Sequence, residues 1–360
     1  MNEPLTLESI AKVCGVSHTT VSRALRGLGN VKPKTAERIR EYAETVGYKP
    51  NAIARSLARS GGGEFHLASS RSIIVPYLEG LMKEDRNPLF WDYIEGAVKA
   101  AALRKSSIEL MGFGLDGEFN FIRALVEENR IAGVLDLGLT PKTIDYLLSK
   151  SIPLVSRLQG VHEINSRQNA CVYPDHIQGY LLAWNHLQSL GHRRFGFIAR
   201  SDHRSRLAEC VAASHLLKEP AALEPVIRID NGASTESIRE ALLSQLGPWH
   251  AEKWPQVFFC SNDDVAHHVI RTLQEMNVSV PRQISIFGFD DSPAAGFCNP
   301  SITTLRNPRR EIGAAMLDLL KEIIAGRPDS RNRVEILPMS LVLRQSVSKP
   351  LPTSNPLPQK

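Results

Sequence analysis

Residues 5–49 predict three short helices, because their apolar side chains recur at helical spacing and no stretch alternates as a strand does. One face of the first helix carries the apolar residues Leu7, Ile10, Ala11 and Cys14. Gly15 ends this helix, since glycine readily adopts the left-handed conformation found at helix C-termini. Ser17 then caps a second helix that runs to about Leu25, and a third helix follows Pro33. The inward face of the third helix carries Ala36, Ile39, Ala43 and Val46.

From about residue 66 onward, short apolar runs alternate with helical patterns. The predicted strands include SIIVPYL, IELMGF, IAGVLDL, IPLVS, RFGFIA, VIRI, QVFFC and ISIFGF. Strands that alternate with helices form parallel sheets covered on both faces, and this many strands predict two such sheets. A late helix starts after Asn307 and Pro308 and ends at Gly326.

The net charge of +5 lies entirely in the first sixth of the chain. Residues 1–60 contain ten basic and five acidic side chains, so residues 61–360 are neutral overall. This distribution is expected of a segment that meets a polyanion, although a solvated helix face can carry a similar charge.

The five cysteines lie far apart and contain no C-x-x-C pair, so neither a disulfide framework nor a zinc site is predicted. The N-terminus lacks the basic and apolar regions of a secretory signal, and no apolar run could span a bilayer. We therefore expect a cytoplasmic protein with reduced thiols and with no cofactor, metal or membrane partner.

The second helix has two different faces at about 100° per residue. Its apolar side carries Val21, Ala24, Leu25 and Leu28, and its polar side carries His18, Thr19, Ser22, Arg23 and Arg26. Short hydrogen-bonding side chains and arginines are the types that reach base edges and phosphates. The second helix of a helix-turn-helix enters the major groove in the same way. Periodicity alone leaves an ordinary solvated face equally open.

LTLESIAKVCGVSHTTVSRALRG, followed later by GYKPNAIARSLA, resembles the headpiece and hinge of the LacI/GalR (lactose repressor) family. The patterns GVS-x-x-TVSR-x-L and GY-x-PN-x-x-AR-x-L carry the resemblance. It implies that His18, Thr19 and Arg23 read bases, and that the second segment becomes a hinge helix on DNA. The full set of implied DNA contacts is Thr6, Ser17, His18, Thr19, Ser22, Arg23, Arg26, Asn51, Ala54, Arg55 and Leu57.

Within the implied hinge, Leu57 is expected to wedge into the minor groove, where an apolar side chain unstacks a base step and bends the duplex. The small Ala54 would let two hinge helices pack closely, and Asn51 and Arg55 can hold the backbone there. The alternative for Leu57 is an ordinary core leucine.

Three later segments resemble the core of the same family: NPLFWDYIEGAVKAA, VYPDHIQGYLLAWNHLQSLGHRRFGFIA and VFFCSNDDVAHHVIRTLQEMNVSVPRQISIFGFDDSPAAGFCNPSITTLRNPRREIG. The resemblance implies the fold of a periplasmic sugar-binding protein, with a ligand between two α/β lobes at the carboxyl ends of the strands. The implied effector contacts are Leu89, Phe90, Arg157, Arg206, Asn262 and Asp290. These side chains suit a sugar or polyol, although some could instead cap helices or pair with each other.

The chain departs from the family pattern at several places. The loop VPYLEGLMKEDRNP is longer than usual, and SRLAECVAASHLL lacks the usual glycine and aromatic residue. His176 stands where asparagine is common, and Lys32 replaces a customary serine cap.

We therefore expect an all-α helix-turn-helix headpiece joined to an α/β periplasmic-binding-protein-like module of two doubly wound parallel-sheet lobes. The expected parts are the headpiece 1–49, a hinge helix and linker 50–65, the two-lobed module 66–346 and a disordered tail 347–360. Lobe 1 is expected at 66–170 and 304–330, and lobe 2 at 171–303 and 331–346.

The predicted function is a transcription regulator, by default a repressor, that binds a near-palindromic operator in double-stranded DNA as a homodimer. A small molecule, a sugar or a derivative of one, would control its affinity for DNA. The chain is not expected to be an enzyme.

Two other functions compete with this prediction. GFGLDG matches the G-x-G-x-x-G pattern of NAD-binding enzymes, and Asp136 lies about where a ribose acid would be expected. The motif follows the second strand of its sheet, however, and glycine-rich connections are common after any strand. A sugar-binding transport protein is disfavoured by the basic head and the missing signal. Asp263, Asp264, His267 and His268 could suggest a metal, but acidic residues are also favoured at a helix start.

Overall fold

The computed structural model describes residues 7–25, 31–46, 71–78, 89–114, 117–158, 169–201, 203–230, 234–248, 250 and 252–351. The chain divides into two units, Met1–Ala68 and Ser69–Lys360. None of the helices in these described ranges is long and apolar enough to cross a membrane.

The first unit contains the predicted helices α1 (Leu7–Cys14), α2 (His18–Leu25) and α3 (Pro33–Thr45). Gly15 ends α1 with a φ of +63°, in the left-handed region that favours glycine. The three helices bury a small apolar core of Ile10, Ala11, Cys14, Val21, Ala24, Ile39 and Ala43. The helical pattern of the N-terminal region is thus confirmed.

Two arginines of α3 hold the other two helices of this unit. Arg38 Nη2 donates to the Cys14 carbonyl oxygen at 2.8 Å, and Arg40 Nε donates to the Ala24 carbonyl oxygen at 3.1 Å. Guanidinium groups satisfy the free carbonyls and oppose the negative dipole at the C-termini of α1 and α2. These two basic residues therefore have a structural role. Lys32 precedes α3 without a side-chain cap, as the departure from serine predicted.

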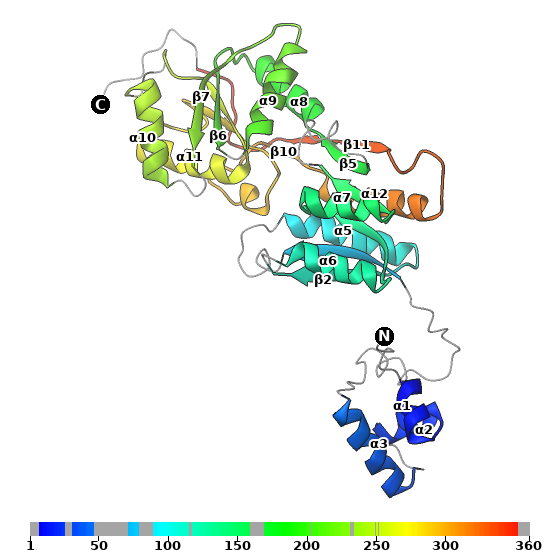
Figure 1. Ribbon diagram of the computed structural model, residues 1–360. Helices are drawn as coiled ribbons and strands as arrows, with labels where there is room; N and C mark the ends of the chain where they lie inside the picture. The colour runs from blue at the N-terminus through cyan, green and yellow to red at the C-terminus, as the bar shows by residue number, and fades with distance from the viewer. Residues whose placement is uncertain are drawn as a thin grey trace. The chain divides into compact units, whose positions relative to one another are not determined.

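The second unit contains two α/β lobes (Figure 1). The sheet of lobe 1 consists of β1 (Ser72–Leu78), β2 (Ile108–Phe113), β3 (Ile131–Asp136), β4 (Leu154–Arg157), β5 (Ala170–Asp175) and β11 (Val334–Pro338). Its strands are parallel and lie in the order β11-β5-β4-β3-β1-β2. One face is covered by α5 (Phe90–Leu103) and α12 (Arg309–Ile324), and the other by α6 (Glu118–Glu127) and α7 (Pro141–Ser149).

The sheet of lobe 2 consists of the parallel strands β6 (Phe195–Arg200), β7 (Leu223–Ile229), β8 (Val257–Cys260) and β9 (Ser285–Phe287), in the order β7-β6-β8-β9. Helices α8 (His176–Ser189) and α9 (Arg204–His215) cover one face, and α10 (Thr235–Leu246) and α11 (Asp263–Glu275) cover the other. Beyond β9 lie η3 (Pro293–Gly296) and an antiparallel pair, β10 (Thr304–Arg306) and β12 (Ser340–Val342). Both sheets are covered on both faces, so the predicted doubly wound fold class is confirmed.

The described chain passes between the lobes at three places: between β5 and α8, between β10 and α12, and between β11 and β12. The expected lobe boundaries are wrong at each of them. Residues 171–175 belong to lobe 1, because β5 pairs with β4 and β11. Residues 304–306 belong to lobe 2, because β10 pairs with β12 and Thr303 bridges to β9. Residues 331–338 belong to lobe 1 through β11.

The expectation of disorder from residue 347 is wrong for residues 347–350. Val347 packs against the core of lobe 2, and the backbone N–H of Ser348 donates to Ser285 Oγ at 3.2 Å. Just before them, Ser346 is fully buried, and its hydroxyl donates to the Ile286 carbonyl oxygen at 2.6 Å. Proline and polar composition therefore misled the prediction, because backbone pairing to a sheet edge needs no apolar pattern. The residues after 351 lie outside the described part of the chain.

Helices α5 and α12 of lobe 1 approach at the level of their backbones. A Cβ atom at Gly313 would lie 1.9 Å from the Tyr93 carbonyl oxygen, and one at Gly96 would lie 1.9 Å from the Arg310 carbonyl oxygen. Each helix therefore needs a glycine where the other crosses it. This packing joins the start of lobe 1 to a helix more than 200 residues later in the sequence.

We expect Gly313→Ala to lower the free energy of unfolding by at least about 1–3 kcal/mol, because the new methyl group overpacks the crossing of α5 and α12. Urea unfolding followed by circular dichroism measures this change. Gly114→Ala is the matched control, since a Cβ there would meet no atom within 4 Å. Equal stability of Gly313→Ala and the control would contradict the described crossing.

Candidate functional site

Helix α2 presents the two faces that its sequence predicts. Val21 and Ala24 are buried in the core of the first unit, while His18, Thr19 and Arg23 are exposed. The apolar side of α2 is therefore fixed by α1 and α3, and the polar side is free to meet another molecule. Short polar side chains and an arginine on one exposed helix can contact base edges and phosphates.

Ser17 caps α2 as predicted. Its hydroxyl oxygen accepts a hydrogen bond from the Thr20 backbone N–H at 3.2 Å and lies 2.9 Å from the Thr20 hydroxyl. Ser22 belongs to α2 as well. The other predicted DNA contacts lie outside the described residues: Thr6, Arg26, Asn51, Ala54, Arg55 and Leu57.

The two lobes of the second unit enclose a cavity of about 330 Å³. Its walls include all six side chains expected to contact an effector: Leu89, Phe90, Arg157, Arg206, Asn262 and Asp290. Arg157 ends β4, Asn262 follows β8, and Asp290 follows β9. Carboxyl ends of parallel strands lie at one edge of a sheet, so two facing edges bring these residues together.

A chain of ion pairs crosses the cavity from lobe 1 to lobe 2. Asp92 of α5 accepts a hydrogen bond from Arg309 Nε at 3.1 Å, and Arg309 Nη1 donates to the Asp290 carbonyl oxygen at 2.8 Å. On the other side of Asp290, its carboxylate lies 3.3 Å from Arg206 Nη2. The Arg206 guanidinium also stacks 3.7 Å from the centroid of the Phe289 ring. Asp290 thus joins an arginine from each lobe.

Asp290 is ionised although it is buried. Burial opposes the charged form, but the Arg206 and Arg309 guanidiniums outweigh burial and hold the pKa of Asp290 below its ordinary value. Its backbone has a φ of +104°, a conformation that side chains other than glycine rarely adopt. The hydrogen bond from the Asp290 N–H to the Leu305 carbonyl oxygen, 2.9 Å long, helps to hold it there.

Some of the residues expected to contact the effector also have structural roles. They cap a helix or pair with each other, which is the alternative that their side chains leave open. Asn262 Oδ1 caps α11 by accepting the Val265 N–H at 2.9 Å, and Arg206 and Asp290 pair with each other. These roles leave the Asn262 amide group and the remaining Asp290 lone pairs on the cavity wall. Structural and binding roles are therefore compatible for these residues.

His176 lies on the cavity wall at the first residue of α8. Its Nδ1 is 2.8 Å from Glu209 Oε2, and the other Glu209 oxygen accepts the Tyr173 hydroxyl at 2.8 Å. Burial lowers the pKa of His176 more than Glu209 raises it. The imidazole is therefore neutral at pH 7, and a proton on Nδ1 leaves Nε2 as a hydrogen-bond acceptor.

Four residues on the cavity wall each carry a buried polar atom that has no hydrogen-bond partner among the described residues. These atoms are Arg157 Nε, His176 Nε2, Ser292 Oγ and Asn307 Oδ1. Because unpaired buried polar atoms are costly, each of them is expected to pair with a bound molecule or with water.

Sequence reasoning missed several of the wall residues, among them Tyr93, Ser292, Asn307 and Arg309. The sequence pattern indicates only that a helix starts after Asn307 and Pro308. The passage of the chain from lobe 2 to lobe 1 at this point brings Asn307 and Arg309 to the cavity. The available signal was the break between the strand and the helix at Asn307-Pro308, but it does not reveal which lobe each element joins.

The candidate NAD-binding motif has no support from its position. The first two residues of GFGLDG are the last two of β2, which is the edge strand of its sheet. Asp136 is buried and accepts hydrogen bonds from the backbone N–H groups of Gly138 and Leu139 at 2.8 and 2.6 Å. Its second oxygen accepts the Ser156 hydroxyl at 2.6 Å. Asp136 therefore shapes its own loop.

Asp263, at the start of α11, serves the fold. Asp263 accepts the Ser292 N–H at 2.6 Å and the Thr304 hydroxyl at 2.7 Å. Burial raises the pKa of Asp263 to about 7. Across the described part of the chain, no three His, Cys, Asp or Glu side chains are grouped so that they could hold a metal ion.

Comparison with known families matches both units of the chain. Residues 6–51 match the family described as bacterial regulatory proteins, lacI family. Residues 184–347 match the family described as a periplasmic binding protein-like domain.

Relatives that match nearly the whole chain are transcription regulators as well. The HTH-type transcriptional regulator GntR of Pseudomonas aeruginosa is 28% identical over 355 residues, covering 95% of each chain. The HTH-type transcriptional repressor PurR of Haemophilus influenzae is 28% identical over 353 residues, covering 95% of this chain and 98% of the relative. Among solved structures, the Lac repressor dimer bound to operator and the anti-inducer ONPF has a TM-score of 0.62 at 21% identity, covering 96% of this chain and 100% of that one. The regulator CelR in complex with cellobiose has a TM-score of 0.61 at 24% identity, covering 95% and 100%. Both solved structures share the fold of this chain.

We expect His176→Gln to reduce the loss of stability on acidification. The lowered pKa of folded His176 means that the unfolded chain takes up a proton first as the pH falls below about 6.5, so the wild type loses stability there. Glutamine keeps a donor to Glu209 but does not titrate. Urea unfolding at about pH 7.5 and about pH 5.5 gives the difference.

His215→Gln, at an exposed position at the end of α9, is the control and should follow the pH dependence of the wild type. An equal loss on acidification in His176→Gln and the wild type would show that His176 is not the neutral buried group described.

Proposed function

Because the chain belongs to the LacI family of bacterial regulatory proteins, we propose that it is a cytoplasmic repressor that binds a near-palindromic operator as a homodimer and responds to a sugar-like effector. The chain is a DNA-binding transcription regulator under the control of a small molecule, rather than an enzyme or a transport protein. The homodimer, the form of the operator and the class of the effector are the parts that we propose.

The observation that carries the proposal is the separation of faces on α2. Val21 and Ala24 are buried, while His18, Thr19 and Arg23 are exposed together. A helix fixed in this way by two companions can lie in the major groove with its polar side toward the base pairs. We propose that these three side chains read bases and that the hinge, with Leu57 as the wedge, contacts the minor groove.

In a homodimer, two headpieces together read a longer DNA site than one headpiece reads alone. Two identical headpieces related by a two-fold axis read two half-sites in opposite orientation, which gives a near-palindromic operator. Lobe 1 exposes apolar side chains on α5 and on the edge strand β2: Val98, Leu103 and Leu110 are 44, 83 and 41% exposed. Such an apolar surface supports a contact between two copies. The Lac repressor with a similar fold is a dimer on its operator.

A sugar-like effector suits the polar wall of the cavity. Asp290 can accept hydrogen bonds from hydroxyl groups, the Asn262 amide can donate to them, and Phe90 offers an apolar surface to a ring. The similar regulator CelR forms a complex with cellobiose. Binding of the effector between the lobes of this protein would change their closure, and thereby the spacing of the two hinges in the dimer. The effector shifts DNA affinity only by its different affinity for the two states, typically about 1–3 kcal/mol.

We expect Arg23→Ala to weaken binding to the selected operator by about 1–3 kcal/mol and to relax the preference at one base pair. Selection of bound sequences from random duplexes defines the operator, and titration of operator and random duplexes at one salt concentration measures both affinities. Lys34→Ala, an exposed position on α3, is the control and should change both affinities by a similar factor. Loss of affinity by the same factor on random DNA would contradict base reading by Arg23.

A further inference from the structure

We propose that the effector carries an acidic group, a carboxylate or a phosphate, which binds Arg157 while its hydroxyl groups face the other polar atoms of the cavity. The inference rests on the proposed function, because it assigns a chemical class to the small molecule that occupies the cavity between the lobes. It begins from the charges on the cavity wall.

Arginines outnumber carboxylates on this wall. The charged residues lining the cavity are Arg157, Arg200, Arg206, Arg309, Asp264 and Asp290. Arg206 and Arg309 share Asp290, and Arg309 also pairs with Asp92. Asp264 is exposed in the first turn of α11, where water and salt screen it. Arg200 has interactions of its own, so the wall residue in the described chain whose charge no carboxylate accompanies is Arg157.

Among the residues that the structure describes, no carboxylate pairs with Arg157, which ends β4 on the lobe 1 side of the cavity. Among the described residues, its guanidinium makes one hydrogen bond, from Nη2 to the Leu137 carbonyl oxygen at 3.1 Å. The same group lies 5.1 Å from the centroid of the Tyr93 ring. Its Nε is buried and has no partner in the described structure. The group is thus held on two sides, with donors left over.

An anion satisfies these donors better than a neutral molecule does. Arg157 is half-buried with its Nε shielded from solvent, so leaving it without a counter-charge costs free energy, and its planar fork matches the two oxygens of a carboxylate or phosphate. Because Leu137 and Tyr93 already orient the fork, little side-chain entropy is lost on binding. Arg157 is therefore the place for the acidic group.

The remaining unpartnered atoms on the wall select for hydroxyl groups. His176 Nε2 and Asn307 Oδ1 are acceptors, and the Ser292 hydroxyl can both accept and donate. Ionised Asp290 adds further acceptor positions. Acceptors require donors, which a hydroxylated carbon chain supplies and a simple dicarboxylate does not. The volume of about 330 Å³ is at the small end of ligand pockets, which favours a ligand of monosaccharide size.

The test uses the full-length protein and a matched panel of ligands. Each of three hexoses (glucose, galactose and mannose) is compared with its aldonic acid, its uronic acid and its 6-phosphate at constant pH and ionic strength. Isothermal titration calorimetry gives the dissociation constants. We expect at least one acid to bind, and its neutral parent to bind at least about 10-fold more weakly, as the loss of a charged hydrogen bond implies. The carboxylate and phosphate series identify which acidic group Arg157 prefers.

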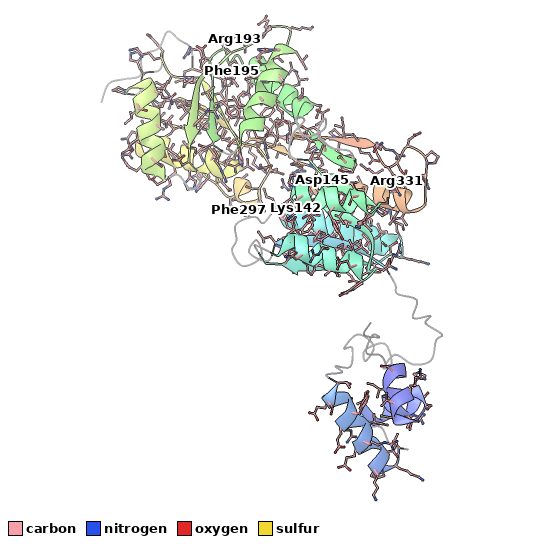
Figure 2. All side chains as sticks on the ribbon, viewed as in Figure 1. Lys142, Asp145, Arg193, Phe195, Phe297 and Arg331 are labelled. Atoms are coloured by element: carbon pink, nitrogen blue, oxygen red, sulfur yellow. The ribbon has the colours of Figure 1, made fainter. Side chains whose placement is uncertain are left out.

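Variants then assign the effect to Arg157. Arg157→Gln should abolish the preference for the acid over its parent sugar, while Arg157→Lys should restore part of it because the charge remains without the fork. Arg331→Gln is the matched control, since Arg331 is an exposed arginine of the same lobe (Figure 2). Thermal unfolding establishes whether each variant is folded. If Arg157→Gln does not fold, the comparison rests on Arg157→Lys.

Three results would overturn the inference: tighter binding of a neutral sugar than of its acids, no binding of any acid in the panel, or an unchanged preference in folded Arg157 variants. Operator affinity measured in the same samples separates this inference from the proposed function. A neutral sugar that alters operator affinity would refute the acidic effector and leave the regulator intact. If the protein selects no sequence from random duplexes, the proposed function itself fails.

Discussion

The ion-pair chain from Asp92 through Arg309 and Asp290 to Arg206 is the interaction on which the cavity depends. Its first two members belong to lobe 1 and its last two to lobe 2, so it ties the two lobes together, as the hydrogen bond from Tyr173 to Glu209 also does. A buried pair of this kind adds little net stability, but removing one partner typically costs about 3–5 kcal/mol because the other charge is left uncompensated. The lobes are therefore held in one arrangement by groups that a ligand can also reach.

This placement explains how a small molecule could act on the arrangement of the lobes. A ligand that offers hydroxyl groups to Asp290 and an acidic group to Arg157 would contact both lobes at once, since Arg157 ends β4 of lobe 1. It would replace or reinforce the existing link, and only the difference between the two states can be passed to the DNA-binding unit. The unpartnered atoms of His176 and Asn307 lie where the chain passes between the lobes. Ligand binding and lobe movement would thus be coupled at the same residues.

Much of this could be predicted from the sequence, because it depends on local patterns. The burial of Val21 and Ala24, the cap at Ser17 and the alternation of strands and helices all follow from periodicity and from residue chemistry. The lobe boundaries could not be predicted, because the apolar pattern of β11 is the same whichever sheet it joins. The residues that the passages between the lobes bring to the cavity could not be predicted for the same reason, and Arg309 is one of them. The order of residues 347–350 could not be predicted, because it depends on partners distant in sequence, such as Ser285, which accepts the Ser348 N–H.

The distance between the lobes tests most directly whether Asp290 holds them together. Nitroxide labels at Asp145→Cys in lobe 1 and Arg193→Cys in lobe 2, both exposed positions, would be placed in a Cys298→Ser background and diluted with unlabelled protein (Figure 2). Double electron–electron resonance should give a narrow distance distribution for this protein and a broader or shifted one after Asp290→Asn. Asp291→Asn should leave it unchanged, because Asp291 pairs with Arg306 and Arg344 within lobe 2. Identical distributions for Asp290→Asn and its unsubstituted parent would contradict the account.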